Sequence, residues 1–498
     1  MRALRSTLLT AVAGVTLAGC ADNLPVQPAA TAPVAPAVSS GPTFSSYIVV
    51  LRNSVQIRGA VTGSSFGALM ASRSGAPSAS ALPGVITNTV PSLNAVVVSG
   101  VKDATLLASA GDVVAVIPNF EHNIIDPAPE DGLGSILEGD PAQAPQGTDQ
   151  SGAFFYGLNY QWDMKRMQAN RAWVPSRGGL GAKVCIVDSG IDAGHNAFTG
   201  KSITSTSMLT GSAAQLDSNF HGSHVAGTVS TNGFGSASVA PNASLMTAKV
   251  FNAAGGGATT DVVLNAVAWC ADNGADVINM SLGFTGGVPI AGFEDFIAYY
   301  QAGLDYATNK GVLIVAAAGN DGMTLPVAGR VFMPAELNGV LSVAATGPNQ
   351  PIPFTSTSPS WQAPDARFDG IASYSNVGPV PSVDVSAPGG NQPTAAYPSQ
   401  SLIISVCSRQ AGRFSGTTWV PRGCTGGSFI FSAGTSMSSP HVAGLAAVVR
   451  GRWPSAVRSP ALRTRIESCI FKTVDNVGST SIFGRGRVNA YRAATTPC

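Results

Sequence analysis

The chain has 498 residues, which is longer than one ordinary domain of roughly 100–200 residues and therefore predicts two or three domains. The formal net charge is only +1, which excludes an electrostatic basis for binding nucleic acid or an acidic membrane surface. Charged residues make up 11% of the chain, well below the roughly 25% of ordinary globular proteins, and the 57 glycines and 33 prolines indicate many turns.

The first 20 residues have the features of an export signal. Arg2 and Arg5 precede an apolar run, residues 7–19, that is too short to span a bilayer. The run ends in Leu-Ala-Gly before Cys20, a pattern that resembles the signal of bacterial lipoproteins, in which the cysteine is lipidated and becomes the new N-terminus. An ordinary secretory signal is the alternative, because small residues before the cut are common to both. Both interpretations predict that the chain leaves the cytoplasm.

The next three segments differ in composition. Residues 21–44 contain five prolines among Ala, Ser and Thr, which predicts an extended tether that cannot bury a core. Residues 45–125 are expected to form a small α+β unit, which could stand alone as a binding module. Its expected elements are strands at 46–52, 93–100 and 113–118 and a helix at 102–110. Residues 126–157, partly rich in Pro, Gly and acidic residues, are expected to be an exposed linker that is open to cleavage.

Residues 158–498 alternate strands with helices, which predicts an α/β domain with a mostly parallel sheet and helices on both faces. Continuous apolar runs such as residues 312–316 are typical of strands that are buried on both faces. The expected strands are 184–187, 277–280, 312–316 and 340–344, and the expected helices lie near 221–230, 260–273 and 293–309. Sites in such sheets gather at the carboxyl ends of strands, and Asp188, Ser281 and Asn320 all fall there.

Three short motifs carry an acid, a base and a hydroxyl. Asp188 ends an apolar strand in VDSGID, His221 stands where a helix begins in HGSHVAG, and Ser436 opens a largely apolar helix in GTSMSSPHVAG. An isolated serine before an apolar run is usually an N-cap, but the other two motifs favour catalysis here. The order Asp, His, Ser is the one known for the subtilisin arrangement of the serine triad.

These motifs resemble those of the subtilase family of serine proteases. A fourth motif, AAAGNDG around Asn320, is similar to the family's oxyanion-asparagine segment. The resemblance covers roughly residues 158–492 as a subtilisin-like catalytic domain. It extends to residues 45–125 as an inhibitor-type propeptide, which implies a folding chaperone and tethered inhibitor rather than an independent module.

The resemblance implies a role for each residue. Ser436 would attack the scissile carbonyl, His221 would take its proton and return it to the leaving amine, and Asp188 would hold the imidazole in the right tautomer. The side-chain amide of Asn320 and the backbone N–H of Ser436 would stabilise the oxyanion. His221 and His224 could instead share a helix face as zinc ligands, but no third ligand with suitable spacing accompanies them.

Two stretches match the family segments that pair with an extended peptide on both sides. They are Gly255, Gly256 and Gly257, and then Ser281, Leu282 and Gly283. Glycine would let the peptide approach closely, and a flexible loop is the alternative for the first stretch.

The chemistry that the resemblance implies requires no cofactor. A structural calcium ion is possible, but the family's high-affinity site is expected to be absent. The position of its acidic residue is taken by Ala197, and the loop 230–238 is short and Gly-rich. Two insertions, roughly 348–370 and 391–430, could shape specificity or brace loops in place of calcium.

Seven cysteines leave six once Cys20 is set aside, an even number that suits disulfides in an oxidising compartment. The sequence alone does not fix their pairing. Closeness in the chain favours Cys407 with Cys424 and Cys469 with Cys498, which leaves Cys185 with Cys270. Two buried free thiols are the alternative for the last pair.

The sequence is therefore interpreted as that of an exported serine endopeptidase that processes itself from a precursor and works as a monomer. Its expected partners are polypeptide substrates, its own propeptide and, before maturation, the membrane through the lipid on Cys20. Cleavage near residues 126–155 would free the catalytic domain from that lipid. A catalytically silent peptide-binding protein on the same fold is the alternative. A serine esterase is disfavoured because Ser436 does not lie in a Gly-x-Ser-x-Gly elbow.

Overall fold

The computed structural model describes most of the chain from residue 44 onward. The described residues are 44–52, 62–66, 68–70, 82–124, 136–137, 147–251, 257–350, 367–391, 394, 399–415, 418–421 and 424–498. Cys20, the expected tether up to residue 43, Gly255 and Gly256 lie outside them. Within the described ranges, no helix combines the length and the hydrophobicity that crossing a bilayer requires.

Residues 44–118, which we call the N-terminal unit, form a four-stranded antiparallel sheet in the order β2-β3-β1-β4. Its elements are β1 (Ser46–Leu51), β2 (Val85–Val90), η3 (Pro91–Leu93), β3 (Ala95–Ser99), α2 (Thr105–Ala108) and β4 (Val113–Pro118). The sequence predicted β1, β3 and β4 but missed β2, and the helix expected over 102–110 is a single turn. Side chains alternate across a strand, so Val49 packs in the unit's own core while Ile48 packs against the large domain.

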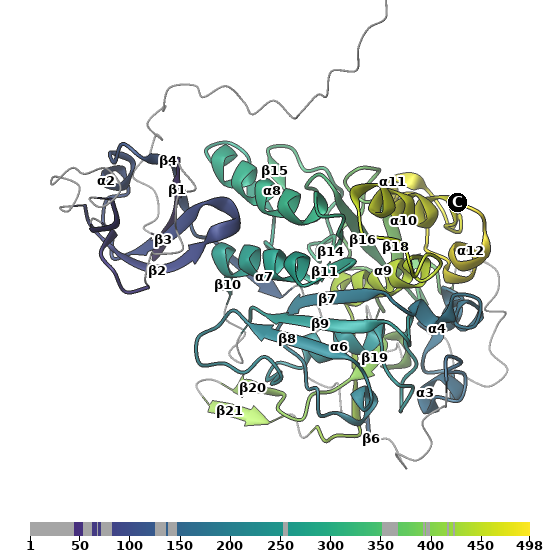
Figure 1. Ribbon diagram of the computed structural model, residues 1–498. Coiled ribbons are helices and arrows are strands. Elements are labelled where there is room, and N and C mark those ends of the chain that lie inside the picture. Colours follow the sequence, from purple (N-terminus) through teal and green to yellow (C-terminus); the bar gives the residue numbers. More distant parts are fainter. Residues whose placement is uncertain are drawn as a thin grey trace, which may run out of the picture.

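The large domain, residues 147–498, is built on a sheet in the order β17-β16-β14-β11-β7-β9-β8, with β18 paired to β16 (Figure 1). All neighbouring strands in it are parallel except the short β17. The strands are β7 (Lys183–Asp188), β8 (Ile203–Ser207), β9 (Ser244–Lys249), β11 (Val277–Met280), β14 (Leu313–Ala317), β16 (Val340–Gly347), β17 (Gly370–Ile371) and β18 (Val385–Pro388). The predicted α/β fold is therefore confirmed.

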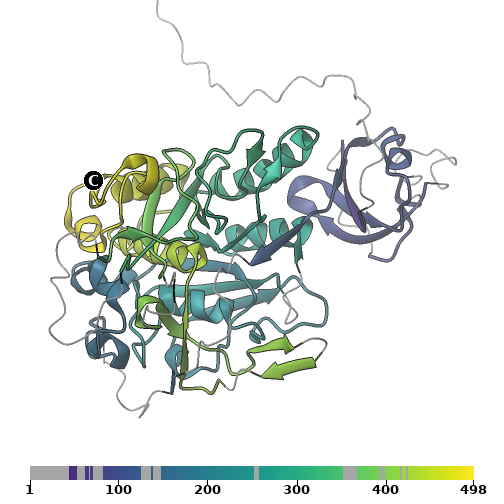
Figure 2. The ribbon, with the colours of Figure 1, turned by 180° about the vertical axis from the view of Figure 1, so that it is seen from behind.

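Helices cover both faces of this sheet because the strands are apolar on both sides. Val184 and Ile186 point into a core with α6 and α9, whereas Cys185 and Val187 point into a core with α7 and α8. The helices are α6 (His221–Val229), α7 (Thr260–Asp272), α8 (Glu294–Thr308), α9 (Thr435–Arg450), α10 (Pro460–Lys472), α11 (Thr480–Phe483) and α12 (Ala490–Thr495). In Figures 1 and 2 the N-terminal unit lies at one side of the large domain, next to α7 and α8.

The remaining strands are short and lie outside the main sheet. The three-stranded sheet β10-β5-β12 joins β5 (Glu121–Ile124) to β10 (Ala258–Thr259) and β12 (Leu282–Gly283). The others are β6 (Ile136–Leu137), β13 (Val288–Pro289), β15 (Arg330–Val331), β19 (Ile403–Val406), β20 (Gly412–Ser415), β21 (Thr418–Pro421) and β22 (Ser428–Ser432). The short helical turns are α3 (Phe154–Gly157), α4 (Trp162–Arg166), α5 (Ala169–Ala172), η5 (Arg177–Gly179), η6 (Asn196–Phe198) and η7 (Ser399–Ser401).

The large domain begins before residue 158, within the segment that the sequence assigns to a linker. Phe155 is fully buried in the core beside α6 and α9, and Gln150 is buried against the loop that follows α6. Composition alone misplaced this boundary because Gln150 is a polar residue, and its burial leaves no apolar signal in the sequence.

The six cysteines after Cys20 form the two pairs that closeness in the chain favours and the third pair that remained, Cys185 with Cys270. Their Cα–Cα distances are 5.9 Å for Cys185–Cys270, 5.8 Å for Cys407–Cys424 and 5.3 Å for Cys469–Cys498. The first pair links β7, which ends at Asp188, to α7 on one face of the sheet.

Candidate active site

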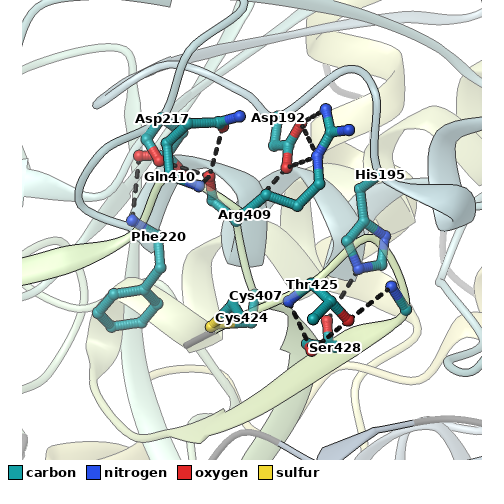
Figure 3. Close-up of a disulfide and its surroundings, with 12 residues drawn as sticks. Asp192, His195, Asp217, Phe220, Cys407, Arg409, Gln410, Cys424, Thr425 and Ser428 are labelled. Atoms are coloured by element: carbon teal, nitrogen blue, oxygen red, sulfur yellow. Dashed lines mark hydrogen bonds and ion pairs between the residues drawn. A yellow bond between two sulfur atoms is a disulfide. The ribbon is translucent and has the colours of Figure 1, made fainter. Parts of the chain in front are cut away.

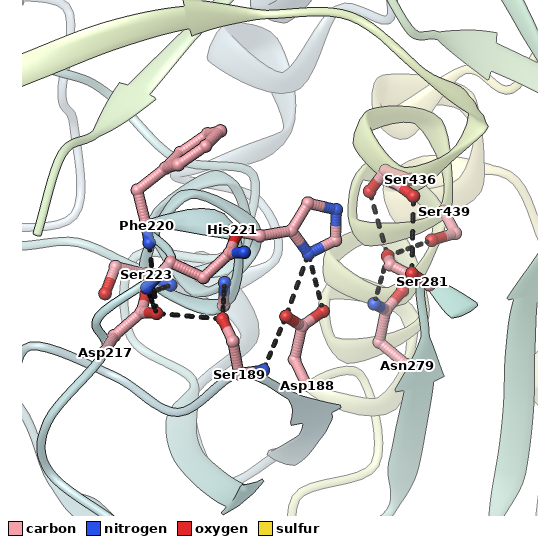
Figure 4. A network of polar contacts seen from close by, with 12 residues as sticks. Asp188, Ser189, Asp217, Phe220, His221, Ser223, Asn279, Ser281, Ser436 and Ser439 are labelled. Carbon is pink, nitrogen blue, oxygen red and sulfur yellow. Dashed lines mark hydrogen bonds and ion pairs between the residues drawn. The ribbon is translucent and has the colours of Figure 1, made fainter. Parts of the chain in front are cut away.

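The acid and the base predicted from the sequence are in direct contact. Asp188 ends β7 and His221 begins α6, and the two side chains are almost fully buried. His221 Nδ1 lies 2.8 Å from Asp188 Oδ1 and 3.0 Å from Oδ2. The carboxylate accepts, so Nδ1 carries a proton, and the opposite edge of the ring faces Ser436 (Figure 4).

A buried carboxylate organises the start of the helix that carries His221. Asp217 accepts hydrogen bonds from the backbone N–H of Ser223 at 2.8 Å and of Phe220 at 3.1 Å, and from the Ser189 hydroxyl at 2.8 Å. Ser189 in turn accepts from the N–H of Gly222 at 2.9 Å. Two donors of the first helical turn are thereby satisfied by side chains, and a negative charge at a helix N-terminus is favourable. Burial raises the pKa of Asp217, and these hydrogen bonds oppose that rise.

Ser436 is the second residue of α9. Because of a proline one turn later in that helix, the backbone of Ser436 bonds to Ser281, which follows β11. Pro440 lies in the second turn, not in the first, and has no N–H to give to the carbonyl of Ser436. That carbonyl instead accepts from the Ser281 hydroxyl at 2.9 Å, and the Ser436 hydroxyl donates to the Ser281 carbonyl at 3.3 Å. Ser281 Oγ also contacts Ser439 Oγ at 2.8 Å (Figure 4). The missing helical bond therefore fixes Ser281 beside the hydroxyl of Ser436.

Asn320 follows β14 and reaches the same helix end. Its side-chain oxygen accepts from the backbone N–H of Thr435 at 3.0 Å and from the Thr435 hydroxyl at 2.8 Å. A backbone N–H can only donate, so the atom that contacts Thr435 is Oδ1. The amide NH₂ therefore points away from Thr435. Asn320 is also one of the residues around a cavity of about 130 Å³, together with Ala317, Phe284 and Phe332.

Gly257 and the second stretch expected to hold an extended peptide, residues 281–283, flank a strand of this same chain. β5 pairs antiparallel with β10, where Ala258 faces His122, and with β12, where Leu282 faces Ile124 and Gly283 faces Asn123. A Cβ on Gly257 would stand 2.7 Å from the Cβ of Glu121 and 3.0 Å from the carbonyl of His122. Glycine at 257 therefore permits the close approach of β5.

The insertion that contains Cys407 and Cys424 packs against Asp192, in the loop after β7, and Asp217, in the loop before α6 (Figure 3). The backbone N–H of Arg409 donates to Asp192 at 2.8 Å and its guanidinium donates at 2.6 Å. The Ser408 hydroxyl donates to the carbonyl of Asp217 at 2.5 Å. The second insertion thus braces two loops next to the candidate site.

The described residues contain no group of three or more His, Cys, Asp and Glu side chains that could hold a metal ion. His224 is buried, its Nε2 donates to the carbonyl of Ile403 at 3.1 Å, and burial lowers its pKa to about 3. Ala197 is buried as well, and the loop 230–238 is held by Gln150, whose amide bonds to Thr231 and Ser238.

Sequence reasoning missed several residues that complete this arrangement. Asp217 and Thr435 stand next to predicted motifs in the chain, so their polar side chains were a usable signal. His122 and the strand β5 gave no such signal, because four residues without an apolar pattern do not predict a strand.

Comparison with known proteins covers the same part of the chain. Residues 179–486 match the model of the subtilase family. The chain is 32% identical to thermitase from Thermoactinomyces vulgaris over 68% of this chain and 97% of that protein. It is also 32% identical to subtilisin DY from Bacillus licheniformis, over 66% of this chain and 96% of that protein.

Two solved structures share the fold. The epidermin leader peptide processing serine protease of Staphylococcus aureus superposes with a TM-score of 0.63 at 20% identity, covering 91% of this chain and 98% of that one. Fervidolysin from Fervidobacterium pennivorans, a keratinolytic enzyme, gives 0.61 at 21% identity, covering 91% of this chain and 61% of that one. With its sequence and its fold in agreement, the chain belongs to the subtilase family and is a serine endopeptidase.

Proposed function

We propose that the chain is exported as a precursor and becomes active by cutting itself in the segment between its two units. In this scheme Ser436 attacks the scissile carbonyl, and His221 accepts the hydroxyl proton and passes it to the leaving amine. Asp188 holds the imidazole and stabilises its cation. The amide of Asn320 and the N–H of Ser436, which lies in the first turn of α9, hold the oxyanion.

The observation that carries this proposal is the position of β5. It lies between β10 and β12, hydrogen-bonded along both sides, as an extended peptide substrate would be. Residues 44–118 then act as the propeptide, because they lead directly into a strand that fills the groove. The roles expected for Gly257, Ser281, Leu282 and Gly283 are consistent with these contacts.

The register of β5 against β12 also indicates a site of cleavage. Leu282 faces Ile124 in an antiparallel register, so the residue after Ile124 is expected to lie opposite Ser281. The carbonyl of Ser281 accepts from the Ser436 hydroxyl. We therefore expect the bond after Ile125 to be cut. The cavity beside Asn320 is lined by apolar side chains and would receive the side chain of an apolar residue at that position.

The test is the intact mass of the wild-type chain and of Ser436→Ala, both made in an exporting host. We expect only the wild type to lose a segment, and the released segment to end at Ile125. Equal cutting of both proteins would assign maturation to another protease. If neither protein were cut and the wild type hydrolysed no peptide, a silent peptide-binding protein would be the better description.

The proposed precursor is a lipoprotein with its lipid on Cys20, which lies on the propeptide side of the cut. The mature domain would then leave the membrane as a monomer unless the propeptide stays bound. Membrane fractions of the same two strains test this point, because Ser436→Ala is expected to stay in the detergent-soluble fraction. Uncut Ser436→Ala protein that left the membrane fraction without detergent would contradict it.

A further inference from the structure

The side chain of His122 on β5 is enclosed in a pocket of the large domain. Both His122 and Tyr300 of α8 are fully buried. The imidazole ring lies 4.2 Å from the ring of Phe284 and 5.3 Å from that of Tyr300, measured between centroids. The pocket is therefore aromatic, and it lies against β10 and β12, the two strands that hold the peptide.

Both nitrogens of the imidazole have a partner in this pocket. Nδ1 lies 2.9 Å from the carbonyl of Ala258, and Nε2 lies 2.9 Å from the hydroxyl of Tyr300. A carbonyl only accepts, so Nδ1 carries the proton and the Tyr300 hydroxyl donates to Nε2. This arrangement fits a neutral imidazole. Burial lowers the pKa of His122 to about 3 and raises the pKa of Tyr300, so both groups are uncharged here.

An apolar side chain of similar size would fill the same space but would leave the Tyr300 hydroxyl without this partner. A buried polar group that loses its hydrogen bond weakens binding by roughly ten- to a hundredfold. A pocket of aromatic rings alone would show no such penalty. The hydroxyl of Tyr300 therefore distinguishes a histidine from a phenylalanine or leucine.

We propose that Tyr300 is a specificity-determining residue, and that the mature protease prefers substrates with histidine at the position of His122. This inference rests on the proposed function, in which the cut follows Ile125 and His122 is the fourth residue before it. The reason is that a propeptide cut by its own active site is also a substrate, and its contacts report what the groove selects.

The test uses the mature protease and a set of peptides that differ only at the fourth residue before the cut. That residue is histidine, phenylalanine, leucine or β-(2-thienyl)alanine, a ring of similar size that lacks both nitrogens. We expect kcat/KM to be at least about tenfold higher for histidine than for the thienyl peptide. This comparison requires no mutant and so does not depend on how a variant folds.

Two variants then locate the effect. Tyr300→Phe removes only the hydroxyl and leaves the Ala258 carbonyl to accept from the imidazole, so we expect the preference for histidine over the thienyl peptide to fall by about fivefold or more without vanishing. Tyr306→Phe is the matched control, because Tyr306 lies on the same helix but donates to Asp272 at 3.0 Å, and it is expected to keep the preference. Equal kcat/KM for all four peptides with the wild type would overturn the inference and leave the protease function intact. If none of the peptides were cut, the proposed function itself would fail, and the inference with it.

Discussion

The oxygen of the Asn320 side chain is fully used by Thr435, which accounts for the orientation of the amide. Two donors from one residue, the N–H and the hydroxyl of Thr435, bind Oδ1 at 3.0 and 2.8 Å. Rotation of the amide would place NH₂ against an N–H, so the bound orientation is strongly favoured. The amide hydrogens are thus held in place before any substrate arrives, which is the condition under which an oxyanion donor is most effective.

Replacing Asn320 by alanine is therefore expected to slow the chemical step while leaving peptide binding nearly unchanged. The expected loss of kcat is about 100- to 1,000-fold, the range already known for the same donor in subtilisin. Steady-state kinetics on a peptide substrate measure it. Asn273→Ala, an exposed asparagine at the end of α7, is the control and should retain the wild-type kcat. An Asn320→Ala variant with the kcat of the wild type would remove Asn320 from the mechanism.

At the scale of elements, the loop after α6 is held by Gln150 from the segment before α3, together with Gln161, which bonds to Ala237 in the same loop. Gln150 donates to the carbonyl of Thr231 at 2.7 Å and accepts from the N–H and the hydroxyl of Ser238 at 2.7 and 3.1 Å. Thr231 and Ser238 lie at the two ends of the loop, so one amide closes it. Because α6 begins with His221, this loop fixes the far end of the helix that carries the base.

Gln150→Ala is expected to lower the free energy of unfolding by about 1–3 kcal/mol, because it leaves buried backbone groups of the loop without partners. The measurement is the urea midpoint in a Ser436→Ala background, which prevents self-digestion. Gln215→Ala, at an exposed position, is the matched control and is expected to unfold at the parent midpoint. An unchanged midpoint for Gln150→Ala would mean that the loop is held by its own internal contacts.

The elements that the sequence predicted well are those whose signals are local. Strands such as β7 and β14 contain continuous apolar runs, and Asp188, His221 and Ser436 each lie in a motif of a few residues. The contact between Asp188 and His221 could be expected because the strand that Asp188 ends and the helix that His221 begins meet at the carboxyl edge of the parallel sheet. The pairing of Cys185 with Cys270 was reached only as the remainder, since nothing local marks it.

Contacts between distant segments were not predictable in the same way. β5 has no apolar alternation, and its partners β10 and β12 follow it by more than a hundred residues. Tyr300 has the appearance of an ordinary core residue of an amphipathic helix until His122 is seen against it. The composition around Gln150 likewise predicts a polar linker. These residues acquire their roles only through tertiary packing.

At the scale of the whole molecule, the N-terminal unit is docked on α7, α8 and the peptide groove together. Asp261 in the first turn of α7 accepts from Asn88 at 2.5 Å and from Asn119 at 2.8 Å, and Asn265 donates to the carbonyl of Thr89 at 2.8 Å. These polar contacts surround the apolar face of the four-stranded sheet. After self-cleavage, the proposed propeptide would therefore stay bound and inhibit until something weakens the contact.

Acidification is expected to weaken the binding of the propeptide through His122. In the complex the pKa of His122 is about 3 because of burial, whereas a histidine in a free peptide titrates near 6.5. The neutral imidazole is the form that binds. The contribution of His122 to the affinity of the propeptide is therefore complete above about pH 6.5 and is lost as the pH falls toward 3. The titratable group that contacts the imidazole is the Tyr300 hydroxyl, which stays protonated. No charged side chain among the described neighbours contributes to the lowered pKa of His122. Between pH 7.5 and pH 5.0 the affinity for the propeptide should fall roughly thirtyfold.

The measurement is the dissociation of the self-cleaved complex at the two pH values, followed by size-exclusion chromatography over a dilution series. His122→Gln supplies the control, because an amide can donate to Ala258 and accept from Tyr300 but does not titrate in this range. We expect the variant complex to dissociate at nearly the same concentration at both pH values. Every other effect of acid is shared by the two proteins, so only the difference between their changes in dissociation with pH reports on His122. An equal change in dissociation between the two pH values in both proteins would show that acid acts elsewhere. A larger change in the wild type would make His122 the residue that couples acidification to release of the protease.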